Sequence, residues 1–394
     1  MTHSRDRHIE QILNQDLKWS PCIGILGMRQ TGKTTLMKKF AKNYFSFDDD
    51  ALPGTLQREG SSILSRGPFP LGFDEVQKFP PFFDQLKMMI DQKKVPGRYL
   101  ITGSVRFNSK KSIRESMTGR MIQFELFPMT LSESHKRKFK PSLKFLEKFR
   151  KDALLQALAD ARQSSLSELE AYEKTGGLPG ICFRRVESIR ERLLNQHLDT
   201  LFGRDIHMVL NTSMSLDQLR RLFFLISSSQ GVPIQYSSLA REAQVSAPTI
   251  KKTLNAFEAL YLIRKLEDVY FVEDSALARL GKIYDYYSHR SIELALVYRE
   301  LRCQLGYEPN MGYQLSRFST RGGAEVPFLL RHSEKDLIAI TVDSGNQVSE
   351  KSLKSLGVLQ KSTKQRILPI ALHFGDQAYL ATRDVPCIPV HWIF

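Results

Sequence analysis

Nine consecutive residues near the start of the chain have the types and the spacing needed to hold a phosphate chain. Two glycines bracket four residues, and a lysine and a threonine follow at once: Gly27-Met28-Arg29-Gln30-Thr31-Gly32-Lys33-Thr34-Thr35. Glycines let backbone N–H groups turn toward anionic oxygens, because they lack a Cβ atom. Lys33 would place its charge on the β- and γ-phosphates, and the Thr34 hydroxyl can ligate Mg²⁺. The spacing is that of a P-loop and predicts ATP binding by this stretch.

The segments on either side of this loop have the patterns that would position it. Upstream, Cys22–Leu26 is a short apolar run typical of a buried strand. Downstream, Leu36, Met37, Phe40 and Ala41 fall on one face of a helix, whose N-terminus would point at the phosphates. The alternative is a glycine-containing loop that matches by chance. A strand before the loop and a helix after it favour the P-loop.

A second group of chemically capable residues follows about forty positions later. A short apolar run, Leu71–Phe73, ends in Asp74 and Glu75. An Asp at a strand end can hold Mg²⁺ through water, and a neighbouring Glu can orient or deprotonate the attacking water. The alternative for such a pair is a solvated helix start. Pro68 and Pro70 predict that this strand is short.

Two more apolar runs complete the pattern expected of a parallel sheet. Tyr99–Thr102 reads as a buried strand that ends at Ser104, where a hydroxyl can sense the γ-phosphate, and Ile122–Leu126 alternates as a further strand. Strands separated by helices predict an α/β fold with a parallel sheet covered on both faces. The chemistry would then lie at the carboxyl ends of the strands.

Composition adds only broad limits. The chain has 394 residues and a formal net charge of +15, which suits two or three domains and favours polyanionic partners, although a solvated basic surface explains the charge equally well. The first residues lack the apolar core of a signal peptide, and no apolar run is long enough to span a bilayer. The four cysteines are scattered singly. We therefore expect a reducing, cytoplasmic compartment and no membrane contact.

The rest of the chain divides into three further parts. We predict an ATPase core over 1–134, a helical lid over 135–212, a winged helix-turn-helix over 213–272 and a small α/β domain over 273–394. A basic connector, His135–Lys140, and then Pro141 mark the first boundary. Helical patterns run from Leu143 to Leu210 and are interrupted by a turn at Gly176–Gly180.

Residues 213–272 show the order helix, short helix, capped helix and hairpin. The third helix would run from about Ala247 to Leu260, with Ser246 as its N-cap. Lys251, Lys252 and Asn255 would lie on its exposed side, where a recognition helix contacts DNA. Packing of this unit against the nucleotide domain, without DNA, stays open as the alternative.

The last hundred residues alternate strands with one helix. We predict a helix over Ser349–Ser362 and the strands Gly312–Arg317, Glu325–Arg331, Leu337–Val342, Ile367–His373 and Val385–Phe394.

Several of these blocks together resemble those of prokaryotic AAA-type ATPases that carry a C-terminal domain of unknown function. The matching blocks are Gly27–Thr35, Asp74–Gln77, Thr102–Ser104, Thr118–Arg120, Phe127–Glu133 and Gly176–Pro179. The resemblance implies an ATPase with Lys33 and Thr34 on phosphate and Mg²⁺, Asp74 and Glu75 as Walker B acids and Ser104 as a sensor. It also implies that Arg120 is an arginine finger or sensor, which acts in trans only in a homo-oligomer. A structural salt bridge is the alternative role for Arg120.

The resemblance further implies that the C-terminal domain has a restriction-endonuclease-like core, and here the sequence departs from the pattern. Pro327 stands where the nuclease needs an acid, and Thr341-Val342-Asp343 stands in place of its Glu-x-Lys triplet. Glu325 alone would bind a divalent ion weakly. We therefore predict that nuclease activity is absent and that the domain binds a partner, which the sequence leaves unknown.

Together these inferences predict an Mg²⁺-dependent ATPase that uses its nucleotide state to switch its lid and C-terminal modules. The alternative is a DNA-associated regulator that binds ATP, contacts DNA through Lys251 and Lys252, and turns ATP over slowly. An ATP-controlled nuclease is disfavoured by Pro327 and Asp343.

Overall fold

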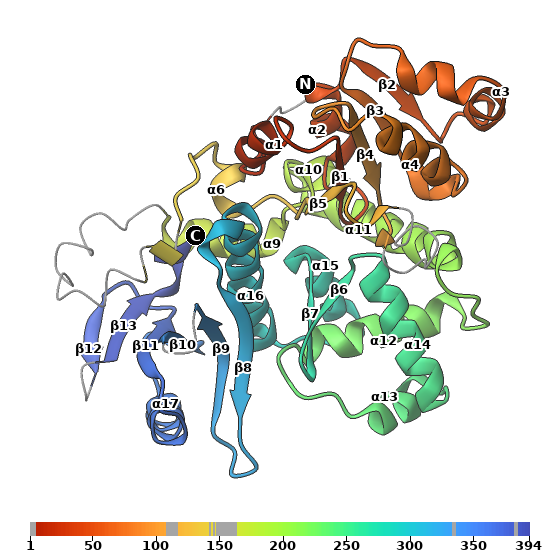
Figure 1. The fold of residues 1–394 in the computed structure, drawn as a ribbon. Helices are drawn as coiled ribbons and strands as arrows, with labels where there is room; N and C mark the ends of the chain where they lie inside the picture. Colours follow the sequence, from red (N-terminus) through yellow and green to blue (C-terminus); the bar gives the residue numbers. More distant parts are fainter. Residues whose placement is uncertain are drawn as a thin grey trace.

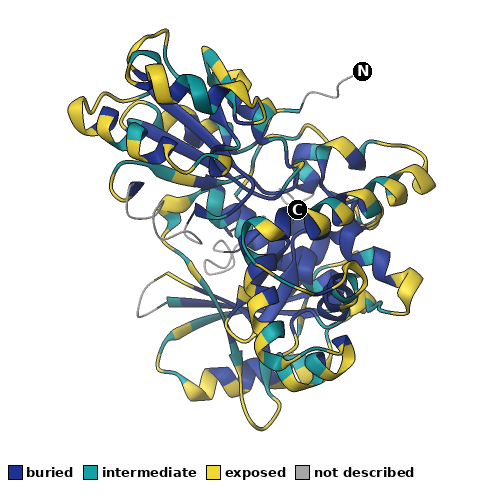
Figure 2. Cartoon of the chain, turned by 90° about the vertical axis from the view of Figure 1, so that its right-hand side faces the viewer, coloured by how far each residue is buried: buried dark blue, intermediate teal, exposed yellow. Residues whose placement is uncertain are grey.

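A computed structural model describes residues 5–107, 117–141, 143–144, 146, 164–332, 336–381 and 385–394. Figure 1 shows three lobes around the long helix α16 (His289–Tyr307). The upper lobe holds the first sheet, the lower right lobe holds helices and a hairpin, and the lower left lobe holds a second sheet. Figure 2 shows that the buried residues run continuously between the lobes.

The first sheet has five parallel strands in the order β2-β3-β4-β1-β5. These strands are β1 (Cys22–Leu26), β2 (Asn43–Ser46), β3 (Leu71–Asp74), β4 (Tyr99–Gly103) and β5 (Ile122–Glu125). Because they are parallel, the P-loop, the acid pair and Ser104 all follow strand ends at one edge of the sheet. The predicted parallel α/β sheet is confirmed.

Both faces of this sheet are covered. Alternate side chains of β1 point to opposite faces, and both sets are buried. Ile23 and Ile25 pack with Leu36 and Leu100 in one core cluster, whereas Cys22 and Leu26 belong to another. The covering helices are α1 (Glu10–Asp16), α2 (Lys33–Phe40), α3 (Ala51–Ser65) and α4 (Phe82–Gln92). A short 3₁₀ turn, η1 (Val76–Lys78), follows the acid pair.

Helix α3 lies in a Gly-, Ser- and Pro-rich stretch for which the sequence analysis predicted no helix. Its buried residues Leu52, Leu56, Gly60 and Leu64 recur at every fourth position and pack α3 beside α4. Gly60 permits a close approach, since a Cβ atom there would lie 2.6 Å from the Oε1 atom of Gln85. Tertiary packing therefore overrides the poor helix propensity of this segment.

A helical region follows the first sheet, and residues 142, 145 and 147–163 of the lid predicted over 135–212 lie outside the described residues. It contains α6 (Leu131–Ser134), α9 (Leu166–Thr175), α10 (Pro179–Cys182), α11 (Glu187–Gly203) and η3 (Asp205–Met208). Capping boxes start α6 at Thr130 and α9 at Ser165.

Residues 213–272 form three helices and a hairpin in the predicted order. They are α12 (Leu216–Ser228), α13 (Tyr236–Ala243), α14 (Ala247–Ala259), β6 (Ile263–Leu266) and β7 (Val269–Val272). Ser246 caps α14 by accepting a hydrogen bond from the Thr249 N–H group at 3.3 Å. Lys251, Lys252 and Asn255 are exposed on α14, as predicted.

The next segment packs with this helical part rather than with the second sheet. Helices α15 (Ser275–Arg279) and α16, joined by the turn η4 (Leu280–Tyr284), contact α12 and β7. The far end of α16 reaches the first sheet, because Cys303 and Tyr307 share a core cluster with Ile23 and Ile25. The predicted boundary between residues 272 and 273 falls inside this packed region.

The second sheet has six strands in the order β12-β13-β11-β10-β9-β8. Its elements are η5 (Pro309–Met311), β8 (Gln314–Ser319), β9 (Glu325–Arg331), β10 (Asp336–Asp343), α17 (Glu350–Ser362), β11 (Arg366–His373), β12 (Tyr379–Ala381), β13 (Val385–Pro389) and η6 (Val390–Ile393). Strands β10, β11 and β13 are parallel to one another. Strand β9 pairs antiparallel with β10, β8 pairs antiparallel with β9, and β12 pairs antiparallel with β13.

The predicted strand Val385–Phe394 is wrong beyond Pro389, where the chain turns into η6. Trp392, Ile393 and Phe394 are all buried in the large core cluster. All five residues of β13 are buried as well, so consecutive buried residues continue from the strand into η6, and the apolar pattern does not distinguish the two conformations.

Candidate functional site

The P-loop adopts a backbone that its two glycines make accessible. Gly27 has a φ of 153° and Gly32 has a φ of 95°, and a Cβ atom on Gly27 would lie 2.3 Å from the carbonyl oxygen of Leu126. Lys33, at the start of α2, is buried, and its Nζ atom donates to the carbonyl oxygens of Gly27 at 3.0 Å and Met28 at 2.9 Å. The loop thus holds the lysine over its own backbone at the N-terminus of a helix.

The carboxylate of Asp74 lies next to this loop and is surrounded by hydroxyl groups. Thr34 Oγ1 donates to Asp74 Oδ2 at 2.6 Å, and the Tyr44 hydroxyl donates to the same oxygen at 3.0 Å. Thr102 Oγ1 donates to the other oxygen, Oδ1. A carboxylate and a hydroxyl this close together are the hard oxygen ligands that Mg²⁺ prefers.

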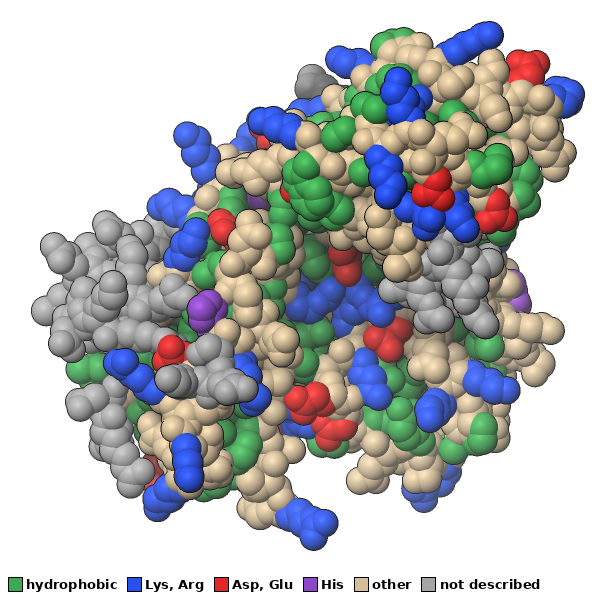
Figure 3. Space-filling model, viewed as in Figure 1, with side chains coloured by type: hydrophobic (Ala, Val, Ile, Leu, Met, Phe, Trp, Pro, Cys, Tyr) green, Lys and Arg blue, Asp and Glu red, His purple; other side chains and the backbone are tan. Residues whose placement is uncertain are grey.

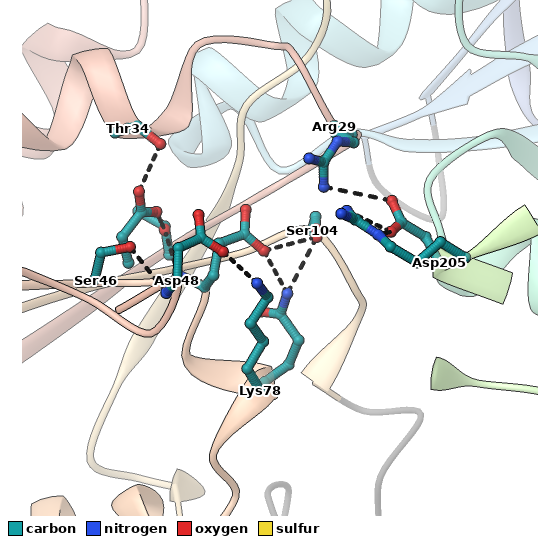
Figure 4. A network of polar contacts seen from close by, with 12 residues as sticks. Arg29, Thr34, Ser46, Asp48, Lys78, Ser104 and Asp205 are labelled. Atoms are coloured by element: carbon teal, nitrogen blue, oxygen red, sulfur yellow. Dashed lines mark hydrogen bonds and ion pairs between the residues drawn. The ribbon is translucent and has the colours of Figure 1, made fainter. Parts of the chain in front are cut away.

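Glu75 is turned out of the strand direction by a positive φ of 55°. Its Oε2 atom accepts hydrogen bonds from Ser104 Oγ at 2.9 Å and from Gln77 Nε2. Figure 4 shows these contacts beside the ion pair of Asp48 with Lys78. The predicted sensor Ser104 is therefore joined directly to the predicted catalytic acid.

A pocket of about 630 Å³ opens over these groups and is closed from the other side by the helical region. The sheet side contributes Lys33, Thr34, Asp74 and Glu75. The helical side contributes residues of α10 and α11: Pro179, Gly180, Ile181, Leu193, Gln196, His197 and Thr200. Burial lowers the pKa of Lys33, and the nearby Glu75 and Asp74 oppose that shift.

One ion pair links the P-loop to the end of the helical region (Figure 4). Arg29 Nη1 lies 3.6 Å from Asp205 Oδ2, and Arg204 Nη2 lies 2.8 Å from Asp205 Oδ1. Asp205 is buried. The loop that would contact phosphate is thus tied electrostatically to the turn η3, just before α12.

A second pocket, of about 910 Å³, lies on the other side of the P-loop. It shares Gly32, Thr35, Pro179 and Gly180 with the first pocket. Apolar side chains of Leu36, Met129, Pro179 and Phe183 line it together with the basic side chains of Arg5, Arg7, Lys39, Arg184 and Arg185. An apolar surface beside basic groups suits a flat heterocycle joined to phosphates.

Arg120 lies away from the other predicted site residues. It precedes β5, at the edge of the sheet opposite the P-loop, and its guanidinium is paired with Asp91 through contacts of 2.6 and 2.8 Å. It therefore does not reach the phosphate site of its own chain. The salt-bridge alternative is present in this structure, and action in trans stays a prediction.

Five residues near the acids and the P-loop were not singled out from the sequence as site residues: Tyr44, Gln77, Thr102, His197 and Asp205. Gln77 and Thr102 lie inside the blocks that carry the family resemblance, so the site residues beside them in these blocks could have indicated them as site residues too. Tyr44 follows α2 on an edge strand, and a tyrosine there has no distinctive spacing. His197 and Asp205 come from the helical region, and only the fold brings them to the P-loop.

The predicted DNA-binding unit shows a mixed surface. Lys251, Lys252 and Asn255 are exposed, but the turn between β6 and β7 carries Glu267 and Asp268, which both contact Arg317 of β8. Figure 3 shows Lys and Arg side chains in the hollow between the upper lobe and the two lower lobes. These positions alone do not establish DNA contact, so the DNA hypothesis stays a prediction.

The residues expected at the degenerate nuclease centre surround one pocket. Glu325, Pro327, Thr341 and Asp343 line a cavity of about 400 Å³ with Arg290, Lys351 and several serines. Arg317 pairs with Glu325, and Ser349 Oγ donates to Asp343 Oδ1 at 2.7 Å. Within the described ranges, no group of three or more His, Cys, Asp or Glu residues could hold a metal ion. The absence of nuclease activity stays a prediction.

Comparisons with known proteins identify the first part of the chain. Residues 20–135 match the model of a family described as an AAA domain, and residues 166–284 match a domain of unknown function, DUF8612. The first segment, with its P-loop and parallel sheet, is thus similar to ATPase domains of the AAA type. The second match ends before the second sheet, and the resemblance of that sheet to a nuclease core is not confirmed. Among the described residues, no helix is both long and apolar enough to cross a membrane.

The relatives are distant. Uncharacterized protein Rv2008c of Mycobacterium tuberculosis is 23% identical over 275 residues, covering 69% of this chain and 55% of that protein. The chain thus spans about half the length of this relative. Uncharacterized protein MJ1544 of Methanocaldococcus jannaschii is 24% identical, covering 84% and 77% of the two chains. The Walker-type ATPase paby2304 of Pyrococcus abyssi aligns with a TM-score of 0.41 at 15% identity, covering 71% of this chain and 96% of the other.

Proposed function

We propose that the chain binds ATP with Mg²⁺ and hydrolyses it, using Lys33, Thr34, Asp74 and Glu75. One observation carries this proposal. The hydroxyl of the P-loop threonine lies 2.6 Å from the strand-end acid, and Glu75, the next residue, lines the same pocket. The P-loop and the end of β3 therefore bring Thr34, Asp74 and Glu75 together at the N-terminus of α2.

The roles follow from the positions. The P-loop N–H groups and Lys33 bind the phosphates, and Thr34 and Asp74 hold the metal ion. Bound Mg²⁺ would neutralise charge that develops on the phosphates. Glu75 orients the attacking water and accepts its proton, and Ser104 and Gln77 orient Glu75. The second pocket, beside Phe183 and Leu36, receives the base and ribose.

The proposed output is a change in how the helical region sits on the nucleotide. Helices α10 and α11 line the phosphate pocket, and Arg29 pairs with Asp205 just before α12. A change in phosphate charge therefore acts on groups that belong to the helical lid. Helix α9 of the lid in turn packs with α15, and the Tyr172 hydroxyl of α9 accepts a hydrogen bond from Arg299 of α16. These contacts support transmission to the C-terminal module and an unknown protein partner.

The test compares two variants that fail at different steps. Lys33→Ala should abolish nucleotide binding, because it removes the positive charge that would contact the phosphates. Glu75→Gln should keep binding and lower turnover by about a hundredfold or more, because only proton acceptance is lost. Binding is measured with a fluorescent ATP analogue and turnover by phosphate release. Equal turnover in the wild type and in Glu75→Gln would refute the assignment of Glu75.

A DNA-associated regulator with slow ATP turnover is the second candidate, and the exposure of Lys251 and Lys252 on α14 favours it. Binding of this kind should weaken steeply with salt, since each neutralised phosphate releases counterions. Lys251→Glu combined with Lys252→Glu should weaken duplex binding for every sequence tested. An affinity that neither salt nor the double change alters would exclude α14 as the contact.

A further inference from the structure

A buried histidine of the helical lid faces the phosphate pocket without a hydrogen-bond partner. His197 lies on α11 and is 2% exposed, and neither Nδ1 nor Nε2 forms a hydrogen bond with any described group. It lines the pocket that also contains Lys33, Asp74 and Glu75. An unpartnered imidazole in such a place is costly, because a buried polar group normally has a partner.

The helix places this side chain on a face directed at the P-loop. Leu193, Gln196, His197 and Thr200 line the pocket at helical spacing. His197 also belongs to the buried face of α11, together with Leu194, Leu198 and Leu201. It therefore lies at the border between the apolar face of the helix and the pocket, and its ring is both buried and in contact with the pocket.

The charges around His197 indicate which ligand would satisfy it. Burial, together with the positive charges of Arg29 and Lys33, lowers the pKa of His197 to about 3. The ring is thus a neutral imidazole, with one N–H donor, among two cations. A phosphate oxygen would attract both cations and accept a hydrogen bond from the ring.

The pocket also indicates which phosphate this would be. His197 lines the pocket of the acids Asp74 and Glu75, and it does not line the second pocket beside Phe183. The acid pair marks the end of the nucleotide where the bond is cleaved. We propose that His197 donates a hydrogen bond to the γ-phosphate of ATP, so that the lid helix α11 distinguishes ATP from ADP. This inference rests on the proposed nucleotide site.

The test measures affinity for two nucleotides in the full chain. His197→Leu keeps a buried side chain of similar volume without a donor, and His197→Gln retains one. Dissociation constants are measured for ADP and for the β,γ-imido analogue of ATP, both with Mg²⁺. We expect His197→Leu to weaken the ATP analogue by about tenfold and to leave ADP within about twofold. His197→Gln should restore part of the loss.

A matched control is His207→Leu, since His207 is exposed on η3, outside both pockets. This variant should bind both nucleotides as the wild type does. Equal weakening of ADP and of the ATP analogue in His197→Leu, or no weakening of either, would overturn the inference and leave the proposed function standing. If the wild type binds neither nucleotide, the proposed function fails as well.

A second measurement applies if His197→Leu does not fold. In the wild type with ¹³C-labelled histidine, the ring signal of His197, assigned by its loss in His197→Gln, should shift with the ATP analogue and stay nearly in place with ADP. A signal that moves equally with both nucleotides would contradict contact with the γ-phosphate.

Discussion

At the scale of single residues, hydroxyl groups shape the site as much as charges do. Thr34, Tyr44 and Thr102 all donate to the carboxylate of Asp74. Each hydroxyl stabilises the ionised acid and fixes its direction toward the P-loop. A strand-end carboxylate held from three sides is already oriented before a metal ion binds.

Tyr44 allows this orientation to be tested, because its hydroxyl donates to Asp74 and can be removed without changing the ring. Burial raises the pKa of Tyr44 to about 12, so its hydroxyl remains a donor at neutral pH. We expect Tyr44→Phe to raise the Mg²⁺ concentration for half-maximal turnover by about threefold to tenfold, as one hydrogen bond is lost. The control Tyr284→Phe changes an exposed tyrosine of η4. An unchanged Mg²⁺ requirement in Tyr44→Phe would show that this contact is dispensable.

Arg120 has two possible roles, an arginine finger acting in trans and a structural ion pair with Asp91. A variant of Asp91 distinguishes them. Asp91→Ala removes the ion pair as completely as Arg120→Ala does, but it keeps the arginine that would act in trans. If Arg120 is a finger, only Arg120→Ala should lose turnover, by about a hundredfold or more, and wild-type turnover per chain should rise with protein concentration. Equal turnover in the two variants at all concentrations would assign Arg120 a structural role.

At the scale of elements, two sequence blocks that looked separate form one contact. Met129 donates its N–H to the Gly177 carbonyl oxygen at 2.7 Å, and Gly177 donates its own N–H to Asp274 Oδ2 at 2.7 Å. Asp274 also caps α15 by accepting from the N–H groups of Ala276 and Leu277. The turn before α10 is thereby held between the ATPase domain and the helices around α16.

Gly177 has no room for a side chain in this contact. A Cβ atom there would lie 2.2 Å from the Met129 carbonyl oxygen, whereas a Cβ atom on Gly180 would meet nothing within 4 Å. We expect Gly177→Ala to lower the free energy of unfolding by about 1 to 3 kcal/mol, since backbone must move. Gly180→Ala, the matched control, should change it little. Chemical denaturation of both variants provides the comparison, and equal stabilities would refute the crowding argument.

Helix α16 gives a prediction for pH. Glu300 is buried on it, and burial raises its pKa to about 7, while its hydrogen bond from Gln304 at 2.7 Å and the nearby Arg299 oppose that shift. An acid whose folded pKa is raised stabilises the fold below its unfolded pKa, and this stability is lost as pH rises through the folded value. Above pH 7 the Glu300 carboxylate is charged while it is buried, which lowers the free energy of unfolding.

Glu300→Gln removes this titration and keeps the acceptor for Gln304. Relative to the wild type, we expect the variant to gain about 1 to 3 kcal/mol of unfolding free energy between pH 5 and pH 8. Denaturation curves for both proteins at the two pH values measure the difference. A difference that is independent of pH would mean that Glu300 is ionised in the fold throughout this range.

At the scale of the whole molecule, the P-loop domain is continuous with the rest of the chain. Cys303 and Tyr307 of α16 pack with Ile23 and Ile25 of the first sheet, and Glu125 at the end of β5 contacts Arg264 and Arg302. Burial raises the pKa of Glu125 to about 7, and the positive charge of Arg302 opposes that shift. The carboxyl edge of the sheet is thus in direct contact with the hairpin and with α16, which is the physical basis for the proposed switching.

The sequence by itself determined the P-loop, the acid pair and the order of strands and helices, because these depend on short-range requirements. A phosphate loop needs glycines at fixed spacing, and a buried parallel strand needs a run of apolar residues. The same local rules identified α14 with its cap and the exposed Lys251 and Lys252. They failed at α3 and beyond Pro389, where burial in the folded core overrides local preference.

Only the tertiary structure decided what surrounds the phosphate pocket. His197, Asp205 and Pro179 lie far along the chain from Lys33, and their approach depends on how α10 and α11 pack over the sheet. It also placed Arg120 at the opposite edge from the P-loop, because a residue before a parallel strand and a residue after one lie at opposite ends of the sheet. Long-range contacts of this kind leave no spacing in the sequence, since they are set by the packing of whole elements.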